Sequence, residues 1–245
     1  MFNFFCSNKI DTDKYAISGG DKNHLVNVLR MKIGEKLIIS DGEKSHLCEL
    51  FEITPESAIV KVVEENFADT SLPVSITLFQ GLPKSDKMEL IIQKAVELGA
   101  DEIVPVEMAR SVVKLLGNKK DNKTIRWQAI SESAAKQSKR VCVPTVSPVI
   151  SFKNALDKVP EFDLFIVPFE SKNGMEDTKE CLSLIKKDMK IGVLIGPEGG
   201  FEQKEIDALI EKNAKIISLG KRILRTETAS ITALSMLMLH AESYL

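Results

Sequence analysis

The fold of this chain is best predicted from two stretches, Ile195-Gly-Pro-Glu-Gly-Gly-Phe201 and Leu219-Gly-Lys-Arg-Ile-Leu-Arg-Thr-Glu-Thr-Ala229. Each follows an apolar run typical of a buried strand and precedes a run with helical periodicity. Each is therefore predicted to be a loop between a strand and a helix. Dinucleotide-binding folds place their glycine fingerprint after the first strand of the sheet. Here the glycines follow a late strand, which indicates another kind of α/β ligand site.

Strands and helices are predicted to alternate on both sides of these loops. The predicted strands are residues 74–80, 103–106, 164–168, 191–196 and 215–219. The predicted helices are residues 85–98, with Ser85 or Asp86 as the cap, and the runs near 122–138, 175–187, 202–212 and 228–243. Such alternation is typical of a mostly parallel sheet with helices on both faces, whose ligands bind beyond the carboxyl ends of the strands.

The first 65 residues show a different pattern. Short apolar runs at 36–40, 46–53 and 58–63 are separated by turn signals such as Asp41-Gly42, which predicts a small β-rich module. Residues 66–73 are polar and end in a proline, as in a linker. We therefore expect two domains, residues 1–70 and 71–245.

Charge is distributed unevenly along the chain. The segment from Arg110 to Arg140 carries nine Lys or Arg and two acidic residues, a net +7 that leaves −9 for the rest of a chain whose total is −2. A segment of this kind is suited to an anion such as nucleic acid, although a solvated basic helix face gives the same pattern. The four cysteines show neither disulfide nor metal spacing, and no long apolar run or signal sequence is present. A cytoplasmic protein without a membrane span is expected.

The two late loops have side chains suited to a binding site. The glycines allow backbone to approach a ligand, and Pro197 stiffens the entry to the first loop. The second loop brings Lys221, Arg222 and Arg225 next to Thr226. The same sequences would also fit two loops without a ligand, the first a tight turn and the second a charged, solvated loop that caps the last helix.

The two stretches resemble the RsmE family of SPOUT methyltransferases. The resemblance extends over nearly the whole chain, through His24-Leu-Val-Asn-Val-Leu-Arg-Met31, Lys84-Ser-Asp-Lys-Met-Glu89, Gln93-Lys-Ala-Val-Glu-Leu-Gly99 and Gln137-Ser-Lys-Arg140. It implies a parallel α/β sheet with a C-terminal trefoil knot, joined to a small N-terminal PUA-like β-barrel that binds RNA. It also implies a homodimer that methylates N3 of a uridine in 16S ribosomal RNA, free or in the small subunit, with S-adenosylmethionine as donor and no metal.

The resemblance also assigns site residues. The cofactor is expected among three loops, at Pro168, Phe169, Ile195, Gly196, Pro197, Glu198, Gly199, Gly200, Ser218, Leu219, Gly220, Ile223, Leu224, Arg225 and Thr226. Methyl transfer needs an aligned, deprotonated acceptor nitrogen, so positioning and proton removal are the two tasks. We expect Arg225, or alternatively Arg222, to stabilise the uracilate charge, and Glu198 or Glu227 to shape the pocket or take the proton.

Contacts with RNA phosphates are expected from nine cationic or histidine residues: His24, Arg30, Lys32, Lys84, Lys94, Arg110, Lys136, Lys139 and Arg140. Two other functions fit the sequence. One is a non-catalytic RNA-binding protein, and the other is a SPOUT methyltransferase that acts on transfer RNA or on a ribose hydroxyl. S-adenosylmethionine should raise the thermal midpoint of an enzyme but not that of a binding module.

Overall fold

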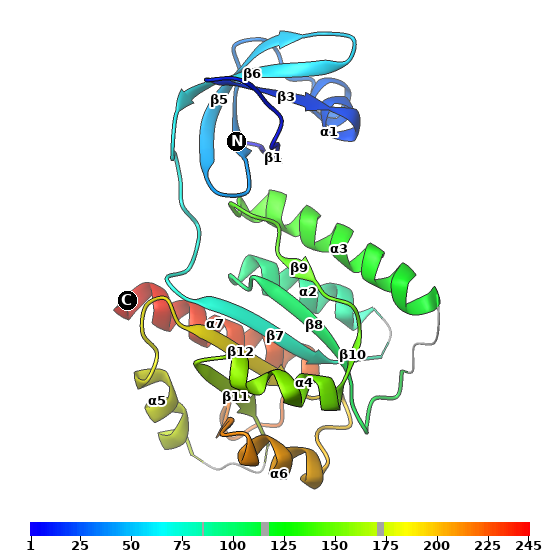
Figure 1. The fold of residues 1–245 in the computed structure, drawn as a ribbon, viewed down its shortest axis with the longest axis vertical. Helices are drawn as coiled ribbons and strands as arrows, with labels where there is room; N and C mark the ends of the chain where they lie inside the picture. Colours follow the sequence, from blue (N-terminus) through cyan, green and yellow to red (C-terminus); the bar gives the residue numbers. More distant parts are fainter. Residues whose placement is uncertain (85, 114–117, 171–173) are drawn as a thin grey trace. The chain divides into compact units, whose positions relative to one another are not determined.

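The computed structural model describes residues 1–84, 86–113, 118–170 and 174–245. These residues form two compact units, each with its own sheet (Figure 1). The first unit comprises Met1–Ser71 and Ala135–Val143, and the second comprises Leu72–Ala134 and Pro144–Leu245. The first unit therefore includes a segment from the middle of the chain, which the sequence did not predict.

The first unit is a curled six-stranded sheet with a short helical segment after β3, and it also includes the last residues of α3 (Asn118–Ser138). Its elements are β1 (Asn3–Phe5), β2 (Lys9–Asp11), β3 (Lys14–Ser18), α1 (Gly19–Asn23), the π-helical turn η1 (His24–Val28), β4 (Lys36–Ser40), β5 (Ser45–Ile53) and β6 (Ser57–Glu64). The strand order is β1-β4-β5-β6-β3-β2, and only the β1–β4 pair is parallel. The three predicted strands are confirmed as β4 to β6. Because the pairing path ends at β1 and β2, the module is a half-barrel.

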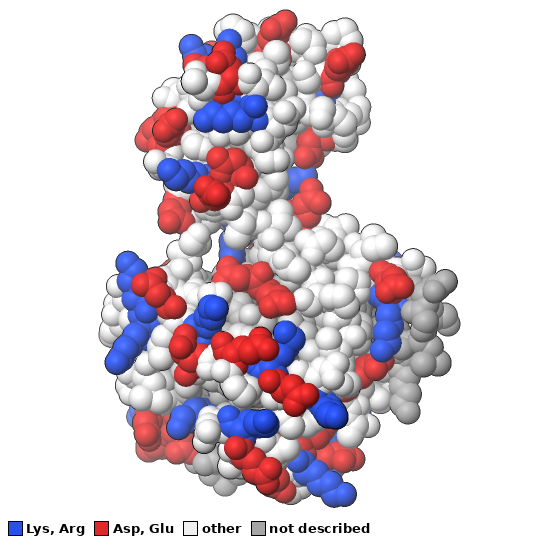
Figure 2. Space-filling model, viewed as in Figure 1, with Lys and Arg blue, Asp and Glu red and all other residues white. Residues whose placement is uncertain are grey.

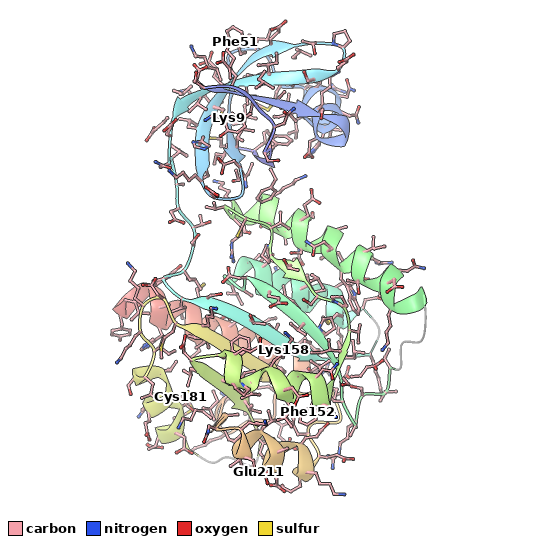
Figure 3. All side chains as sticks on the ribbon, viewed as in Figure 1. Lys9, Phe51, Phe152, Lys158, Cys181 and Glu211 are labelled. Carbon is pink, nitrogen blue, oxygen red and sulfur yellow. The ribbon has the colours of Figure 1, made fainter. Side chains whose placement is uncertain are left out.

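Alternating side chains explain the core of this module. Leu37 and Ile39 on β4, Leu50 on β5 and Val60 on β6 are fully buried, together with Leu25 from η1. Residues two apart on a strand point to the same face, so the apolar positions of three strands gather on one side. The outer face keeps exposed side chains such as Phe51 (Figure 3).

The second unit is a parallel α/β sheet, as predicted. Its strands are β7 (Ser75–Gly81), β8 (Glu102–Glu107), β9 (Thr145–Val146), β10 (Ile150–Ser151), β11 (Leu164–Pro168), β12 (Lys190–Ile195) and β13 (Lys215–Ile217). Its helices are α2 (Lys87–Glu97), α3 (Asn118–Ser138), α4 (Phe152–Lys158), the 3-10 turn η2 (Val159–Glu161), α5 (Glu176–Ser183), α6 (Gln203–Glu211) and α7 (Thr226–Tyr244). The short elements β9, β10, α4 and η2 were not predicted, because each is too brief to show a period. Phe152 and Lys158 mark the ends of α4 in Figure 3.

The helix α2 shows how the sequence specifies these elements. Met88, Ile91, Ile92 and Ala95 recur at helical spacing and are all buried. The N-cap is Asp86, while Ser85, the other predicted cap, lies outside the described residues. The helix ends just before Gly99, whose positive φ of 95° a glycine adopts without strain.

Strand order in the second unit brings the two late loops together. The order is β10-β8-β7-β12-β11-β13, so β12 lies between β7 and β11, and β13 lies beyond β11. After β13 the chain returns as α7, which packs against α2 and β12 (Figure 1). All these strands are parallel, and their carboxyl ends therefore meet at one edge of the sheet. The loops that follow β11, β12 and β13 open at that edge.

Candidate functional site

A cavity of about 440 Å³ lies at the carboxyl ends of β11, β12 and β13. Three loops line it, contributing residues 168–170, 195–201 and 219–226, and Lys87 and Ala229 complete the lining. This volume lies in the range of small-molecule sites. The structure therefore brings together nearly all residues predicted to hold a cofactor. Two predicted site residues, Ser218 and Glu227, are not among the described residues that line the cavity.

The first wall of the cavity, the loop of residues 196–201 that follows β12, leaves no room for side chains at two glycines. A Cβ on Gly199 would lie 2.8 Å from Cβ of Arg110, and one on Gly196 would lie 3.0 Å from the Phe201 ring. Gly200 has a φ of 68°, and its N–H donates to the Pro197 carbonyl at 2.9 Å. The Arg110 guanidinium donates to the Gly199 carbonyl at 3.2 Å. The loop is thus a packed turn whose shape depends on glycine.

A buried polar chain connects this wall to α7. The Thr226 hydroxyl donates to the Gly196 carbonyl at 2.7 Å, and the Gln80 side-chain amide donates to the same hydroxyl at 2.9 Å. Ser230 donates to the Gln80 amide oxygen. Gln80 is fully buried near the end of β7, beside Ile195 in the sheet register. Sequence reasoning missed Gln80, since a lone glutamine within an apolar strand carries no motif.

An ion cluster holds the outer side of the same wall. The Lys87 ammonium lies 3.2 Å from a Glu198 carboxylate oxygen and 3.1 Å from one of Glu227. The backbone N–H of Lys84 donates to Glu198 at 3.0 Å. Burial alone would raise the pKa of Glu198, but the Lys84 hydrogen bond and the Lys87 charge outweigh burial and lower it. Glu198 is therefore ionised and bonded near the start of α2, where negative charge is favourable. Lys87, whose pKa is raised by Glu227 and Glu198, was also missed by sequence reasoning.

The second wall, the loop of residues 218–225 that follows β13, is fixed at its base. The Thr178 hydroxyl of α5 donates to the Ser218 carbonyl at 2.8 Å and accepts from the Ser218 N–H at 3.2 Å. The Ser218 hydroxyl in turn accepts from the Gly220 N–H. Ser218 thus supports the loop from below rather than lining the cavity, which explains why it is missing from the lining.

The tip of the second wall is open to solvent. Ile223 is 82% exposed, and the side chains of Lys221, Arg222 and Arg225 are exposed as well. Within the described parts of the chain, these three cations make no hydrogen bond or ion pair with a side chain. Arg225 is also the N-cap of α7, whose first amides have no partners within the helix. Among the lining residues that the structure describes, the unpaired cations thus all lie on the second wall.

The lining fits S-adenosylmethionine, the expected donor. Ile195, Phe169, Leu219 and Leu224 offer apolar surface for a base, while the glycine-containing walls expose backbone amides and carbonyls to polar groups. Gly220 has a φ of 110° and open space where a Cβ would stand. The structure therefore supports a nucleoside-sized ligand between the two walls.

The residues predicted to contact RNA differ in exposure and in their partners within the protein. His24, Arg30 and Lys32 in the first unit, Lys84 in the second and Lys139 are exposed. Arg140 is only 4% exposed, and its contact with RNA phosphate stays a prediction. Other predicted cations have partners within the protein, as in the pairs Lys136–Asp21, Lys94–Glu97 and Arg110–Gly199.

Acidic side chains also compensate the basic segment around α3. Arg126 pairs with Glu89 at 2.8 Å and Lys120 pairs with Glu107 at 3.0 Å. Figure 2 shows Lys and Arg interspersed with Asp and Glu over the face that it draws. The +7 of this segment therefore overstates its free positive charge.

Two further findings concern the described residues only. No helix there is long and apolar enough to span a bilayer, and no group of three or more His, Cys, Asp or Glu could hold a metal ion. The four cysteines are free thiols. Burial raises the pKa of Cys181 on α5 to about 11, so this thiol (Figure 3) stays protonated at neutral pH.

Comparisons with known proteins agree with this geometry. Residues 70–238 match the family model of the RNA methyltransferase domain, and residues 17–63 match that of the RNA methyltransferase PUA domain. Ribosomal RNA small subunit methyltransferase E of Bacillus subtilis is 39% identical over 233 residues, 93% of this chain and 91% of that protein. The Mycobacterium tuberculosis protein of the same name is 30% identical over 94% of this chain and 88% of its own length.

Solved structures give the same result. The crystal structure of ribosomal RNA small subunit methyltransferase E from Neisseria gonorrhoeae, bound to S-adenosyl methionine, superposes with a TM-score of 0.81 at 31% identity, covering 98% of this chain and 97% of that one. A second crystal structure, of a hypothetical protein, gives a TM-score of 0.90 at 35% identity over 98% of both chains. With the strand order, these matches confirm the predicted fold class, a SPOUT-type parallel sheet joined to a PUA-like N-terminal module.

Proposed function

Because the chain belongs to the ribosomal RNA small subunit methyltransferase E family, we propose that it methylates N3 of a uridine in 16S ribosomal RNA, with S-adenosylmethionine as donor. The observation that carries the proposal is the cavity between the 196–201 and 218–225 loops, which has the size and the mixed apolar and backbone lining that this donor needs. The donor supplies a methyl group bound to a sulfonium sulfur. The acceptor nitrogen attacks the methyl carbon in line with the carbon–sulfur bond. The tasks left to the protein are holding the donor, aligning the base and stabilising charge.

Arg225 is the residue that we assign to charge stabilisation. It lines the cavity, is exposed and has no described partner for its guanidinium. It also begins α7, so the positive end of that helix dipole points the same way. The negative charge of a uracilate formed at the cavity mouth would be stabilised by the Arg225 guanidinium and by the N-terminus of α7. Arg222, at the tip of the same loop, lies further from α7 in sequence and is the second candidate.

We assign Glu198 and Glu227 to shaping the pocket. Both carboxylates pair with Lys87, and the lowered pKa of Glu198 makes it a weak proton acceptor at neutral pH. In this assignment the N3 proton leaves to solvent at the open mouth. Lys87 joins the loop after β12 to the first turn of α7.

We assign residues 1–70 to RNA binding, as a PUA-like domain, and residues 71–245 to catalysis. The exposed cations of the first unit, Arg30 and Lys32, would contact phosphates. Changing both to alanine should lower RNA affinity and flatten its dependence on salt. Changing Lys22 to alanine, a cation that already donates to the Pro55 carbonyl, is the matched control. The family resemblance further suggests a cytoplasmic homodimer, testable by light scattering of the purified chain.

The decisive experiment is mass spectrometry of ribosomal RNA from a deletion strain. We expect one uridine of 16S RNA to lack an N3 methyl group, and the pure protein with S-adenosylmethionine to restore it. Methylation that appears instead on transfer RNA or on a ribose hydroxyl would favour another SPOUT activity. A chain that binds RNA but shows no rise in thermal midpoint with S-adenosylmethionine would be a binding module.

A further inference from the structure

Gln80 on β7 has an environment that core packing does not explain. It is fully buried, and its neighbours on the strand, Leu78 and Phe79, are apolar and buried too. A buried amide is costly unless its polar atoms find partners. Leucine or methionine would fill the same volume without that cost. The partners of Gln80 should therefore reveal why an amide stands here.

The hydrogen bonds of Gln80 have one possible direction. Its side-chain nitrogen lies 2.9 Å from the Gly81 carbonyl oxygen, which can only accept, so the NH₂ group must face it. The same nitrogen lies 2.9 Å from the Thr226 hydroxyl. That hydroxyl must then accept from Gln80, and its single proton is free to bond the Gly196 carbonyl at 2.7 Å.

This chain of bonds ends at both walls of the cavity. Gly196 is the first residue of the 196–201 loop, and Thr226 directly follows the 218–225 loop. Both residues line the cavity, whereas Gln80 lies behind it and is absent from the described lining. The Thr226–Gly196 hydrogen bond therefore sets the separation of the two walls. Gln80 orients the Thr226 hydroxyl that donates this bond.

Building on the proposed function, we propose that Gln80 is a positioning residue for the methyl-donor pocket. It acts through Thr226 to hold the two pocket walls at the separation that binds S-adenosylmethionine. The amide does not touch the donor. Its role is to keep the Thr226 hydroxyl proton directed at the Gly196 carbonyl oxygen, so that the first wall is already in place when the donor binds.

The test compares Gln80→Met with wild type by calorimetric titration with S-adenosylmethionine. Methionine matches the shape of glutamine but cannot orient the hydroxyl. We expect Kd to rise about tenfold, equivalent to about 1.4 kcal/mol. The thermal midpoint without ligand should stay equal or rise, because an apolar side chain replaces a buried amide. A purely structural role would instead lower the thermal midpoint and leave Kd unchanged.

Two further variants complete the design. Thr226→Val should weaken donor binding to the same extent, and the double variant should be no worse than either single one, because both act through one bond. Thr226→Ser keeps the hydroxyl and should restore most of the affinity. Thr77→Val, on the same strand and also a buried polar residue, is the matched control and should bind the donor as wild type does.

The outcomes separate this inference from the proposed function. If wild type binds S-adenosylmethionine and methylates 16S RNA while Gln80→Met binds the donor equally well, the inference is wrong and the function stands. If wild type binds the donor with the expected pattern across the variants but modifies no 16S uridine, the function is wrong and the inference stands. Additive losses in the double variant would also refute the inference.

Discussion

The two walls of the cavity differ in how they are held. The 196–201 loop is bonded to β7 and α7 through Thr226, to the α2 region through Glu198, and to Arg110 after β8. The 218–225 loop is bonded to α5 at Ser218, and its tip of Lys221, Arg222 and Ile223 is exposed. One wall is therefore built before any ligand binds, and the other is open at its tip.

The difference indicates a division of labour. A rigid wall suits a ligand that is the same in every turnover, and this is the methyl donor. An exposed, cationic loop tip suits a large anionic substrate that must enter and leave. Binding energy for the donor is best obtained from a preorganised surface, whereas RNA recognition tolerates local adjustment. Changes in the first wall should therefore affect donor affinity, and changes in the second should affect the methylated RNA.

The largest effect is expected from Arg225 at the end of the second wall. Arg225→Ala should lower the single-turnover methylation rate about 100-fold or more, because a preorganised charge facing developing negative charge is lost. Donor affinity measured by calorimetry should change little. Arg222→Ala is the control and should retain most of the rate. A near-normal rate for Arg225→Ala would refute its assignment and remove the proposed difference between the walls.

A smaller effect is expected from Gly199 in the first wall. Gly199→Ala places a Cβ 2.8 Å from Cβ of Arg110, so loop or neighbour must move. We expect donor Kd to rise about tenfold, about 1.4 kcal/mol, by calorimetry. Gly200→Asn is the matched control, since Asn tolerates a φ of 68° and a Cβ there meets nothing within 4 Å. Equal losses for both variants would show that the wall is not sterically fixed.

Removing the Glu198 charge should have a moderate and pH-dependent effect. Glu198→Gln should lower the free energy of unfolding by about 1 kcal/mol at pH 7. The pKa of Glu198 is lower in the folded state than its ordinary 4.5, so the carboxylate contributes stability above about pH 4.5. That contribution is lost as pH falls through the folded pKa. Denaturation curves should therefore converge for wild type and variant in acid; a gap that widens in acid would contradict the anchor role.

The smallest effect is expected at Ile223. Because this side chain is 82% exposed, Ile223→Ser should change the free energy of unfolding by less than about 0.5 kcal/mol. Ile195→Ser, in the buried strand below the cavity, is the contrasting variant and should be strongly destabilising. Thermal denaturation measures both. A loss of several degrees for Ile223→Ser would mean that the loop tip is packed in solution.

The features that could be predicted from the sequence are those set by residues close together in the chain. Buried strands such as β11 and β12 show as apolar runs, and α2 shows as a helical period with a glycine after its end. The glycines of the 196–201 loop could be assigned to a cofactor wall because they follow such a strand. The order of β12, β11 and β13 came only from the structure, since no periodicity encodes which strands become neighbours.

The parts that the sequence missed depend on distant partners. Gln80 bonds Thr226 across 146 residues, and the Lys84 N–H meets Glu198 across 114. Each partner is an ordinary residue in its own segment, so only the fold reveals the pair. The net charge of the segment around α3 does not reveal such partners either. Arg140 is buried, and Lys136 pairs with Asp21, which is distant in the sequence.

The position of α7 has a consequence for protein synthesis. The first wall needs the Thr226 hydroxyl on its Gly196 carbonyl, and the second wall ends where α7 begins. A ribosome that has translated β7 through β12 has therefore made most of the sheet but no competent pocket. A pocket able to bind the methyl donor forms only after α7 has been synthesised and has packed against α2. A chain that lacks α7 therefore also lacks the Thr226 bond on which the first wall depends.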